Sequence, residues 1–289
     1  MGNYARAAGQ KLVIFRTCSE DGCVHGTQKR GIRMLQIVTF NLRCVWDHDG
    51  VNSFVHRAGG IIEKVRAQSP DIICFQEATE QNVSFLKAAL TDYYIIYSQR
   101  EQGWSGEGLA TAYRRDRLNL QTMDCFWLSP TPRVPGSRFA NQSMCSRICQ
   151  TMLFKDLLTG RMLRTYNVHL DHISDEARVQ GIRCVLERIA GDTAEAALPF
   201  FLMGDFNAEP ESETMRFCNA AQNPPMTELT AGIEATFHAF GRLEKLEKID
   251  YIYADAATAR ELIAVDCWED CLNGIYLSDH YPVAVRLKW

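Results

Sequence analysis

The sequence lacks any long hydrophobic run. None approaches the ~20 apolar residues that a membrane-spanning helix needs, and residues 1–10 lack the basic-then-apolar order of a secretory signal. Even so, 46% of the 289 residues are hydrophobic, which is enough for a sizeable core. We therefore expect a monomeric protein of the cytoplasm with no membrane partner, built as one large domain or two small ones.

The sequence also lacks an excess of positive charge. Its formal net charge is −4 and its isoelectric point is about 6.0. Proteins that hold long nucleic-acid duplexes through the phosphates usually present a basic face, so tight non-specific DNA binding is not expected. Arginines gather only locally, at positions 114, 115 and 117 and at positions 133, 138 and 147.

Paired zinc-ligand motifs are absent as well. The eleven cysteines are spread along the chain without a Cys-x-x-Cys pair. Cys145 and Cys149 are four residues apart, as are Cys267 and Cys271, which is not the usual zinc spacing. These cysteines are expected to be buried thiols in a reducing compartment. No repeat or low-complexity linker divides the chain.

What the sequence does contain is a set of polar clusters, each after or within a strand-like apolar segment. They are Thr39–Arg43, Phe75–Glu77, Asn167–His172, Gly204–Asn207, Ile249–Tyr253 and Ser278–His280. Clusters that recur at strand ends indicate one site assembled from many segments. Their carboxylates, amides and imidazoles suit a hard divalent cation and a phosphate better than zinc.

The hydrophobic spacing predicts alternating helices and strands from Met34 onward. Helices are expected at 53–68, 79–90, 174–190 and 211–219, with Ser53 capping the first and Val55 on its inner face. Strands are expected at 34–38, 71–75, 93–98, 109–113, 150–158, 162–169, 199–203, 249–253 and 282–287. Helical crossovers come first and antiparallel strands last, which favours mixed sheets over a doubly wound parallel sheet.

Residues 1–33 differ from the rest of the chain. Residues 18–33 are polar and show no period, so we expect a loosely ordered extension before a catalytic domain at 34–289. Two long loops, Gln99–Gly108 and Ser129–Arg147, interrupt that domain. Long ordered loops often line functional sites.

Glu77, Asp205 and Asn207 stand at strand ends. A carboxylate such as that of Glu77 can hold Mg²⁺, which keeps several waters and needs only one or two protein carboxylates. In an extended segment Asp205 and Asn207 share one face, where the Asp can take a proton from water. Asn207 can then hold a phosphate oxygen or fix the Asp. A surface turn at Glu77 and an Asx turn at Asp205 are the structural alternatives.

Two histidines precede or follow strands. His280 can donate to a phosphoryl oxygen as negative charge develops there, and Asp250 is a candidate partner that keeps it protonated. His169 and Asp171 are expected to share a face, with His172 pointing away.

Taken together, the six clusters resemble the motifs of the endonuclease/exonuclease/phosphatase superfamily, in order from Met34 to Leu287. That superfamily includes pancreatic deoxyribonuclease, abasic-site endonucleases, inositol polyphosphate 5-phosphatases, sphingomyelinases and the deadenylases. Three further segments look most like its deadenylase-like and uncharacterised bacterial branch: His169–Arg178, Phe126–Ser129 and Thr236–His238.

The resemblance implies an α/β (α+β) fold, a four-layer α-β-β-α sandwich of two mixed, mostly antiparallel sheets flanked by helices. It implies Mg²⁺, or Mn²⁺, at Glu77 with Asp279 and Asn41. Asp205 is expected to activate water, Asn207 and Asn41 to hold phosphate or supporting groups, and His169 to contact the scissile phosphate. His280 with Asp250 is expected to stabilise the pentavalent state. Further contacts to substrate are expected from Arg43, Arg147, Asp171 and His238.

The expected function is water attack on a phosphodiester by a Mg²⁺-dependent phosphoesterase, foremost a 3′–5′ exonuclease on short single strands. Loop aromatics, Trp46, Trp104 and Phe139, suit a base or a sugar. The alternative is a phosphatase or phosphodiesterase acting on a small phosphorylated metabolite or lipid head group. An inactive binding module is a third reading, which the intact residue set disfavours.

Overall fold

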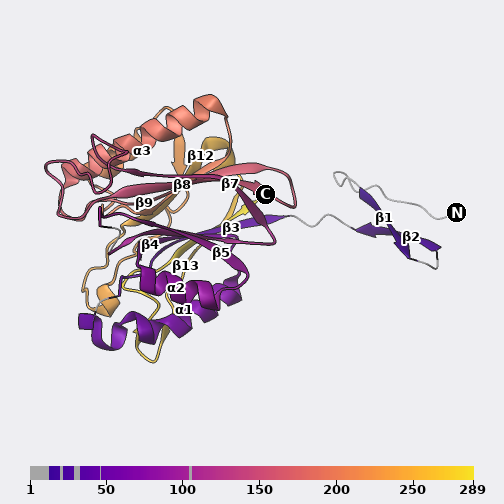
Figure 1. Cartoon of the computed structure of the whole chain (residues 1–289), viewed down its shortest axis with the longest axis horizontal. Coiled ribbons are helices and arrows are strands. Elements are labelled where there is room, and N and C mark those ends of the chain that lie inside the picture. The colour runs from indigo at the N-terminus through magenta and orange to yellow at the C-terminus, as the bar shows by residue number, and fades with distance from the viewer. Residues whose placement is uncertain (1–12, 20–21, 29–32, 46, 104–105) are drawn as a thin grey trace.

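Two six-stranded sheets lie face to face between helices. A computed structural model describes residues 13–19, 22–28, 33–45, 47–103 and 106–289 (Figure 1). The strands are β1 (Val13–Ser19), β2 (Gly22–Gln28), β3 (Met34–Asn41), β4 (Ile72–Ala78), β5 (Tyr93–Gln99), β6 (Gly108–Arg114), β7 (Leu118–Trp127), β8 (Ile148–Asp156), β9 (Met162–His169), β10 (Phe200–Asp205), β11 (Met226–Glu228), β12 (Asp250–Asp255), β13 (Leu262–Cys267), β14 (Cys271–Leu272), β15 (Ile275–Tyr276) and β16 (Val283–Lys288). The α-helices are α1 (Phe54–Gln68), α2 (Glu80–Ala89), α3 (Asp175–Glu195), α4 (Glu213–Asn219) and α5 (Ala256–Ala259), with 3₁₀ turns η1 (Asp47–Asn52) and η2 (Ala239–Gly241).

The strand order confirms the predicted mixed sheets. The β3 sheet runs β13-β16-β3-β4-β6-β5 and the β10 sheet runs β11-β12-β10-β9-β8-β7. Within them β3 pairs with β4, and β9 with β10, in parallel, whereas the other neighbours are antiparallel. Figure 1 shows α3 outside the β10 sheet and α1 and α2 outside the β3 sheet, which gives the predicted four layers.

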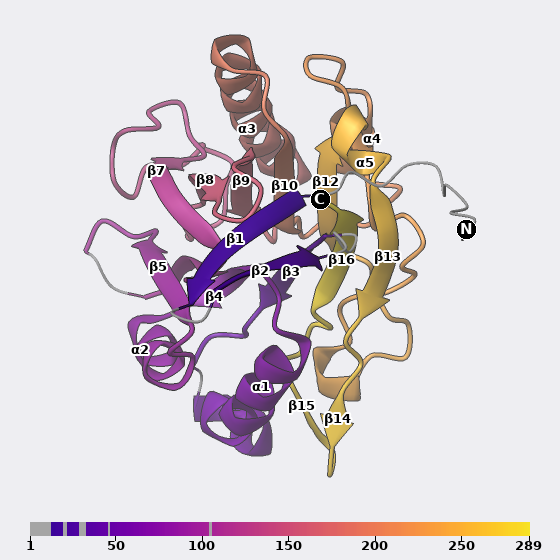
Figure 2. The same cartoon turned by 90° about the vertical axis from the view of Figure 1, so that its right-hand side faces the viewer.

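Side chains alternate between two buried faces on the central strands. On β10, Phe200 and Leu202 pack against the helix side while Phe201 and Met203 pack between the sheets. This alternation follows from the two-residue repeat of a strand, and burial of both faces explains the continuous apolar run. Figure 2 shows how the two sheets spread across the molecule, with β10 and β3 near the middle.

The predicted helices form, with local corrections. The helix predicted from Ser53 begins at Phe54, and the Ser53 side chain makes no capping hydrogen bond. Val55 is 75% exposed, and Phe54 is buried in its place. The helix predicted at 79–90 does carry its cap, because the Thr79 hydroxyl accepts from the N–H of Asn82 at 3.3 Å. No helix among the described residues is long and apolar enough to cross a membrane.

Three edge strands were not predicted from the sequence: β7, β13 and the three-residue β11. β7 and β13 lie at the edges of the β10 and β3 sheets. Many of their side chains are exposed or half-buried, and each has a register irregularity, between Leu120 and Thr122 and between Leu262 and Ala264. Such strands lack the clean apolar alternation by which buried strands are recognised.

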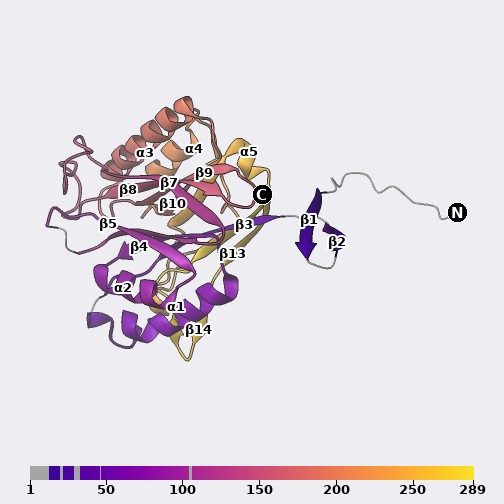
Figure 3. The ribbon, with the colours of Figure 1, turned by 45° about the vertical axis from the view of Figure 1, so that its right-hand side comes forward.

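The N-terminal segment contains a β-hairpin that the sequence did not indicate. β1 pairs antiparallel with β2, from Val13 opposite Gln28 to Ser19 opposite Gly22. Figures 1 and 3 show the hairpin lying apart from the two sheets. Residues 1–12, 20–21 and 29–32 lie outside the described residues, so the predicted loose order of this segment stays a prediction.

We expect a polypeptide that begins at Met34 to fold and to keep full turnover. Among the described residues, the hydrogen bonds to the catalytic domain that it loses are those of Arg33, whose carbonyl oxygen accepts from the N–H of Trp289 at 2.8 Å and whose side chain donates to Leu158 O at 2.5 Å. Losing such contacts lowers the melting temperature by about 2–8 °C. A thermal melt of both chains, with kcat measured on each, checks this. Aggregation, or a melting point lower by tens of degrees, would show that residues 1–33 stabilise the core.

Candidate active site

The predicted site residues converge because strands of both sheets end at the same edge. In the β10 sheet the register places His169 beside Asp205, and Asp205 beside Asp250. In the β3 sheet Asn41 ends β3 beside Gln76 of β4. Since β3 and β4 are parallel, as are β9 and β10, the carboxyl ends of each pair meet at one edge. Residues up to 239 positions apart in the chain thereby become neighbours.

A glycine lets Asp205 reach this position. Gly204 has φ +150°, and a Cβ added there would lie 1.9 Å from the carbonyl oxygen of Val168 on the neighbouring strand. Only a residue without a side chain fits such a close approach. The Gly204-Asp205 pair is therefore needed for β10 to pack against β9.

A β-bulge aims Glu77 into the site. Between the pairs Phe75–Ala110 and Ala78–Gly108 of β4 and β6, two residues of β4 face one residue of β6. Glu77 in this bulge has φ +51°. Bulges next to active sites re-aim side chains, and a left-handed non-glycine residue costs roughly 1–3 kcal/mol, a strain that clusters at functional sites. Arg43 (φ +52°) and Asn207 (φ +48°) share this conformation.

An amide pair joins the two sheets directly behind the site. The side chain of Gln76 donates to Oδ1 of Asn167 at 2.8 Å, and Asn167 donates to the carbonyl oxygens of Phe75 and Ala110. All these groups are buried, where satisfied networks are rigid. Both residues belong to the sequence clusters, but their role in holding the sheets in register was not recognised from the sequence.

Asn41 contacts three other residues of the site, Glu77, Asp205 and His280. Its Nδ2 donates to Glu77 Oε1 at 3.1 Å and to Asp205 Oδ2 at 2.9 Å, and lies 3.4 Å from His280 Nε2. Asp205 also accepts from the N–H of Asn207 at 2.8 Å. The sequence prediction that Asp205 and Asn207 act together is thus realised through an Asx-type turn rather than through an extended segment.

These residues border a cavity of about 450 Å³. Its lining includes the predicted residues Arg43, Glu77, Arg147, His169, Asp205, Asn207, Asp279 and His280, together with Cys44, Arg100, Glu107 and His172. Asn41 and Asp250 are buried behind this lining and orient it.

His280 is held as a cation. Its Nδ1 lies 2.8 Å from Oδ2 of Asp250. Burial by itself lowers the pKa of His280, but the nearby carboxylates of Asp250, Asp205 and Asp279 outweigh burial and raise the pKa to about 10. The imidazolium can therefore donate from Nε2 to a phosphoryl oxygen at neutral pH.

Asp205 is suited to exchange a proton with water. Burial and the charge of Asp250 raise the pKa of Asp205 to about 7. His169 Nε2 lies 3.5 Å from its Oδ2. Burial and the charges of Arg147 and Arg100 hold the pKa of His169 well below its ordinary value, so His169 is neutral. A base with a pKa near the working pH is the form that proton transfer favours.

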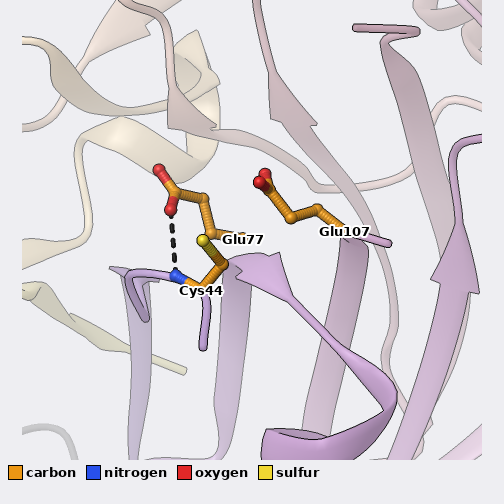
Figure 4. Close-up of side chains that lie close together, drawn as sticks. All are labelled: Cys44, Glu77 and Glu107. Carbon is orange, nitrogen blue, oxygen red and sulfur yellow. Dashed lines mark hydrogen bonds between the residues drawn. The ribbon is translucent and has the colours of Figure 1, made fainter. Parts of the chain in front are cut away.

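The acidic side of the cavity offers oxygen ligands for a cation. Figure 4 shows Glu77 and Glu107 lying beside Cys44, whose N–H donates to Glu77 Oε2 at 2.9 Å. The ligand atoms of the three residues lie within 4.8 Å of one another. Burial raises the pKa of the Cys44 thiol, which keeps it protonated. Two carboxylates and no thiolate fit Mg²⁺ or Mn²⁺ better than zinc.

Asp279 borders the same acidic side. Burial raises its pKa, and the charge of Glu77 raises it further. Its Oδ2 lies 3.7 Å from Nε of Arg43. Arg43 itself donates two hydrogen bonds to Asp49, at 3.0 and 3.1 Å, so much of its charge is already paired.

The predicted substrate contact Asp171 does not line the cavity, whereas its neighbour His172 does. His172 lines the cavity, and Asp171 is buried behind it, where it accepts from the N–H groups of Ser143, Ile173 and Ser174. The expected facing of these two side chains is reversed because β9 ends at His169 and the two-residue alternation stops there.

His238 does not border the cavity. It stacks on Tyr281 with ring centroids 4.0 Å apart. Trp46 and Trp104 lie outside the described residues.

Glu107 and Arg100 were missed. A signal for Glu107 was present: like Glu77 it is an acid next to a buried strand, at the end of a loop already expected to line a site. Arg100 opens the same loop.

Comparison with known proteins identifies the class. Residues 38–280 match the model of the Endonuclease/Exonuclease/phosphatase family. The fold is similar to an endonuclease/exonuclease/phosphatase of Bacteroides vulgatus, with TM-score 0.81 and 27% identity over 88% of this chain and 98% of that one. It is also similar to a mannosyl-6-phosphatase of Bacteroides thetaiotaomicron, with TM-score 0.77 and 26% identity over 87% and 98% of the two chains.

A curated relative is Nocturnin of Drosophila melanogaster, 29% identical over 54% of this chain. The matched region spans only 24% of the length of Nocturnin. The chain therefore belongs to the endonuclease/exonuclease/phosphatase family, as the sequence motifs predicted. Members of this family are metal-dependent hydrolases of phosphate esters, and the predicted enzyme class is confirmed.

Proposed function

We propose that this protein is a Mg²⁺- or Mn²⁺-dependent phosphoesterase that hydrolyses a small phosphorylated molecule. The observation that carries this proposal is the cavity: the catalytic-type residues border a pocket of about 450 Å³. That size falls within the range of small-molecule sites.

The loop arginines also favour a small substrate over a strand of nucleic acid. Arg133 is paired with Asp124 through two hydrogen bonds, at 2.6 and 2.8 Å, and Arg138 donates to the carbonyl oxygen of Ser143. Neither lines the cavity. Of the three arginines in the 129–147 loop, only Arg147 lines the cavity. The likeness to a bacterial mannosyl-6-phosphatase supports the same substrate class.

The roles of the residues follow from their geometry. Glu77, with Asp279 and Glu107 beside it, holds the cation, which supplies charge stabilisation to the reacting phosphate. Asp205, held by Asn41 and Asn207, accepts a proton from the attacking water. His280, kept protonated by Asp250, donates to a phosphoryl oxygen. His169, at the end of β9 in the other sheet, contacts the same phosphoryl group.

The test compares three substrates with Mg²⁺ and with Mn²⁺, across a salt series. They are mannose 6-phosphate, a short labelled single-stranded oligonucleotide and a nicked duplex. We expect the highest kcat/KM on the sugar phosphate and a shallow salt dependence, because a strand held by Z phosphate contacts loses affinity with a slope of about −0.7Z. Release of single nucleotides from the 3′ end at higher kcat/KM would instead identify the exonuclease that the sequence alone favoured.

A further inference from the structure

The cavity has a basic side that the proposed roles leave unexplained. Arg100 follows β5 and Arg147 precedes β8, and both line the cavity, where Arg100 pairs with Glu107. Their relative exposures are 8% and 4%. Two guanidinium groups this deeply buried are costly unless each is fully paired.

Arg147 is not fully paired. It donates from Nη2 to Nδ1 of His172 at 2.9 Å. Its Nε lies 4.0 Å from Asp171 Oδ1, beyond hydrogen-bond distance, since Asp171 is occupied by the N–H groups of the 143 and 173–174 segments. Nε and Nη1 have no hydrogen-bond partner among the described residues. A buried donor without an acceptor costs about 1–3 kcal/mol.

Arg100 does not relieve this imbalance. It pairs with Glu107 Oε2 at 3.0 Å, and its Nε lies 3.4 Å from Glu101 Oε1 but makes no hydrogen bond within the described part of the chain. The charge of Glu107 also raises the pKa of Arg147, and the charge of Glu77 raises the pKa of Glu107. After burial, the charge of Arg100 is the largest influence that lowers the pKa of Arg147, so the two cations are close.

A structural arginine in the same protein looks different. Arg57 is 1% exposed, and all three of its guanidinium nitrogens donate to carbonyl oxygens, at 2.6 to 3.1 Å. The chain thus satisfies a buried guanidinium where its role is to hold loops together. At Arg147 it leaves the group incomplete beside a cavity.

We propose that Arg147, with Arg100, binds a second anionic group of the substrate, a phosphate or a carboxylate separate from the phosphate that is hydrolysed. The identity of the hydrolysed group rests on the proposed function. Arg147 contacts His172, three residues beyond His169 at the end of β9, which places this subsite on the His169 side of the cavity. The substrate class is therefore a small phosphate ester with two anionic groups.

The test measures kcat/KM with Mg²⁺ for glucose 6-phosphate, glucose 1,6-bisphosphate and 6-phosphogluconate. In the wild-type protein we expect a preference of about 10- to 100-fold for a doubly anionic substrate, the range that charge-assisted hydrogen bonds supply. A preference for glucose 1,6-bisphosphate alone would show that the subsite binds a phosphate. A preference for both doubly anionic substrates would show that it also accepts a carboxylate. Arg147→Gln should abolish the preference, mainly through KM, by lowering kcat/KM more on the two doubly anionic substrates than on glucose 6-phosphate.

Two further variants serve as controls for Arg147→Gln. Arg147→Lys keeps the charge without the planar fork and should retain part of the preference. If the Gln variant does not fold, as judged by thermal melting, the Lys variant decides: an unchanged preference overturns the proposal. Arg133→Gln alters an exposed arginine outside the cavity and should leave all three substrates unaffected.

Equal kcat/KM on all three substrates in the wild type would overturn the subsite, as would an equal loss on all three in Arg147→Gln. Failure of the proposed function looks different, because then none of the substrates is turned over. In that event the melting temperature is measured with and without sulfate. A rise in the wild type that is absent in Arg147→Gln supports the anion subsite, and no rise in the wild type contradicts it.

Discussion

The Glu77→Gln variant is expected to lose activity by roughly 10³-fold, because the cation contributes several kcal/mol to the transition state. The change keeps the shape of the side chain and removes its charge. Glu77 lies in a bulge that aims it at the cavity, and both of its oxygens are oriented, by Asn41 Nδ2 and by the N–H of Cys44. The amide oxygen can keep one of these two hydrogen bonds, and the neutral side chain should bind Mg²⁺ with weaker affinity.

The measurement is kcat/KM over a Mg²⁺ titration, with Mn²⁺ binding followed by calorimetry. Glu80→Gln is the matched control, since Glu80 is exposed in the first turn of α2 and should be silent. Undiminished activity in EDTA, or a Gln variant that binds Mn²⁺ as the wild type does, would refute the role of Glu77.

The His280→Ala variant is expected to lose about 10²–10³-fold in kcat, the scale for one donor aimed at a developing oxyanion. KM should change less, because the interaction strengthens in the transition state. His56→Ala, at an exposed position on α1, is the control. A change confined to KM would mark His280 as a contact to the bound substrate only.

The pH profile of Asp250→Asn tests why His280 is charged. In the wild type the pKa of His280 is about 10, so the imidazolium is lost only as the pH rises through about 10. Removing the charge of Asp250 removes the largest influence that raises this pKa, so burial should lower it. We expect the alkaline limb of the kcat profile to move to lower pH. An alkaline limb that stays in place would exclude Asp250 as the partner that matters.

Much of this molecule follows from local sequence. The run Phe200–Met203 predicts a strand buried on both faces, and β10 is such a strand. The spacing of Val83 and Leu86 predicts the inner face of α2. The spacing of apolar residues indicates which side of a helix or strand is buried. These buried sides pack against one another and form the layers of the fold. The order of the six motifs along the chain predicted the family, and each motif lies at or near the end of a strand or on one.

The sequence by itself therefore determined the four layers, the strand ends and the residues that gather there. Only the tertiary structure decided how the cavity is completed. Arg100 and Glu107 enter it from a loop, and His172 replaces Asp171 in its lining. Loop conformation beyond a strand end is set by packing against distant segments such as 143–147, so no local period reports it. The same is true of Arg147, whose Nε and Nη1 lack hydrogen-bond partners among the described residues because Asp171 accepts from other groups.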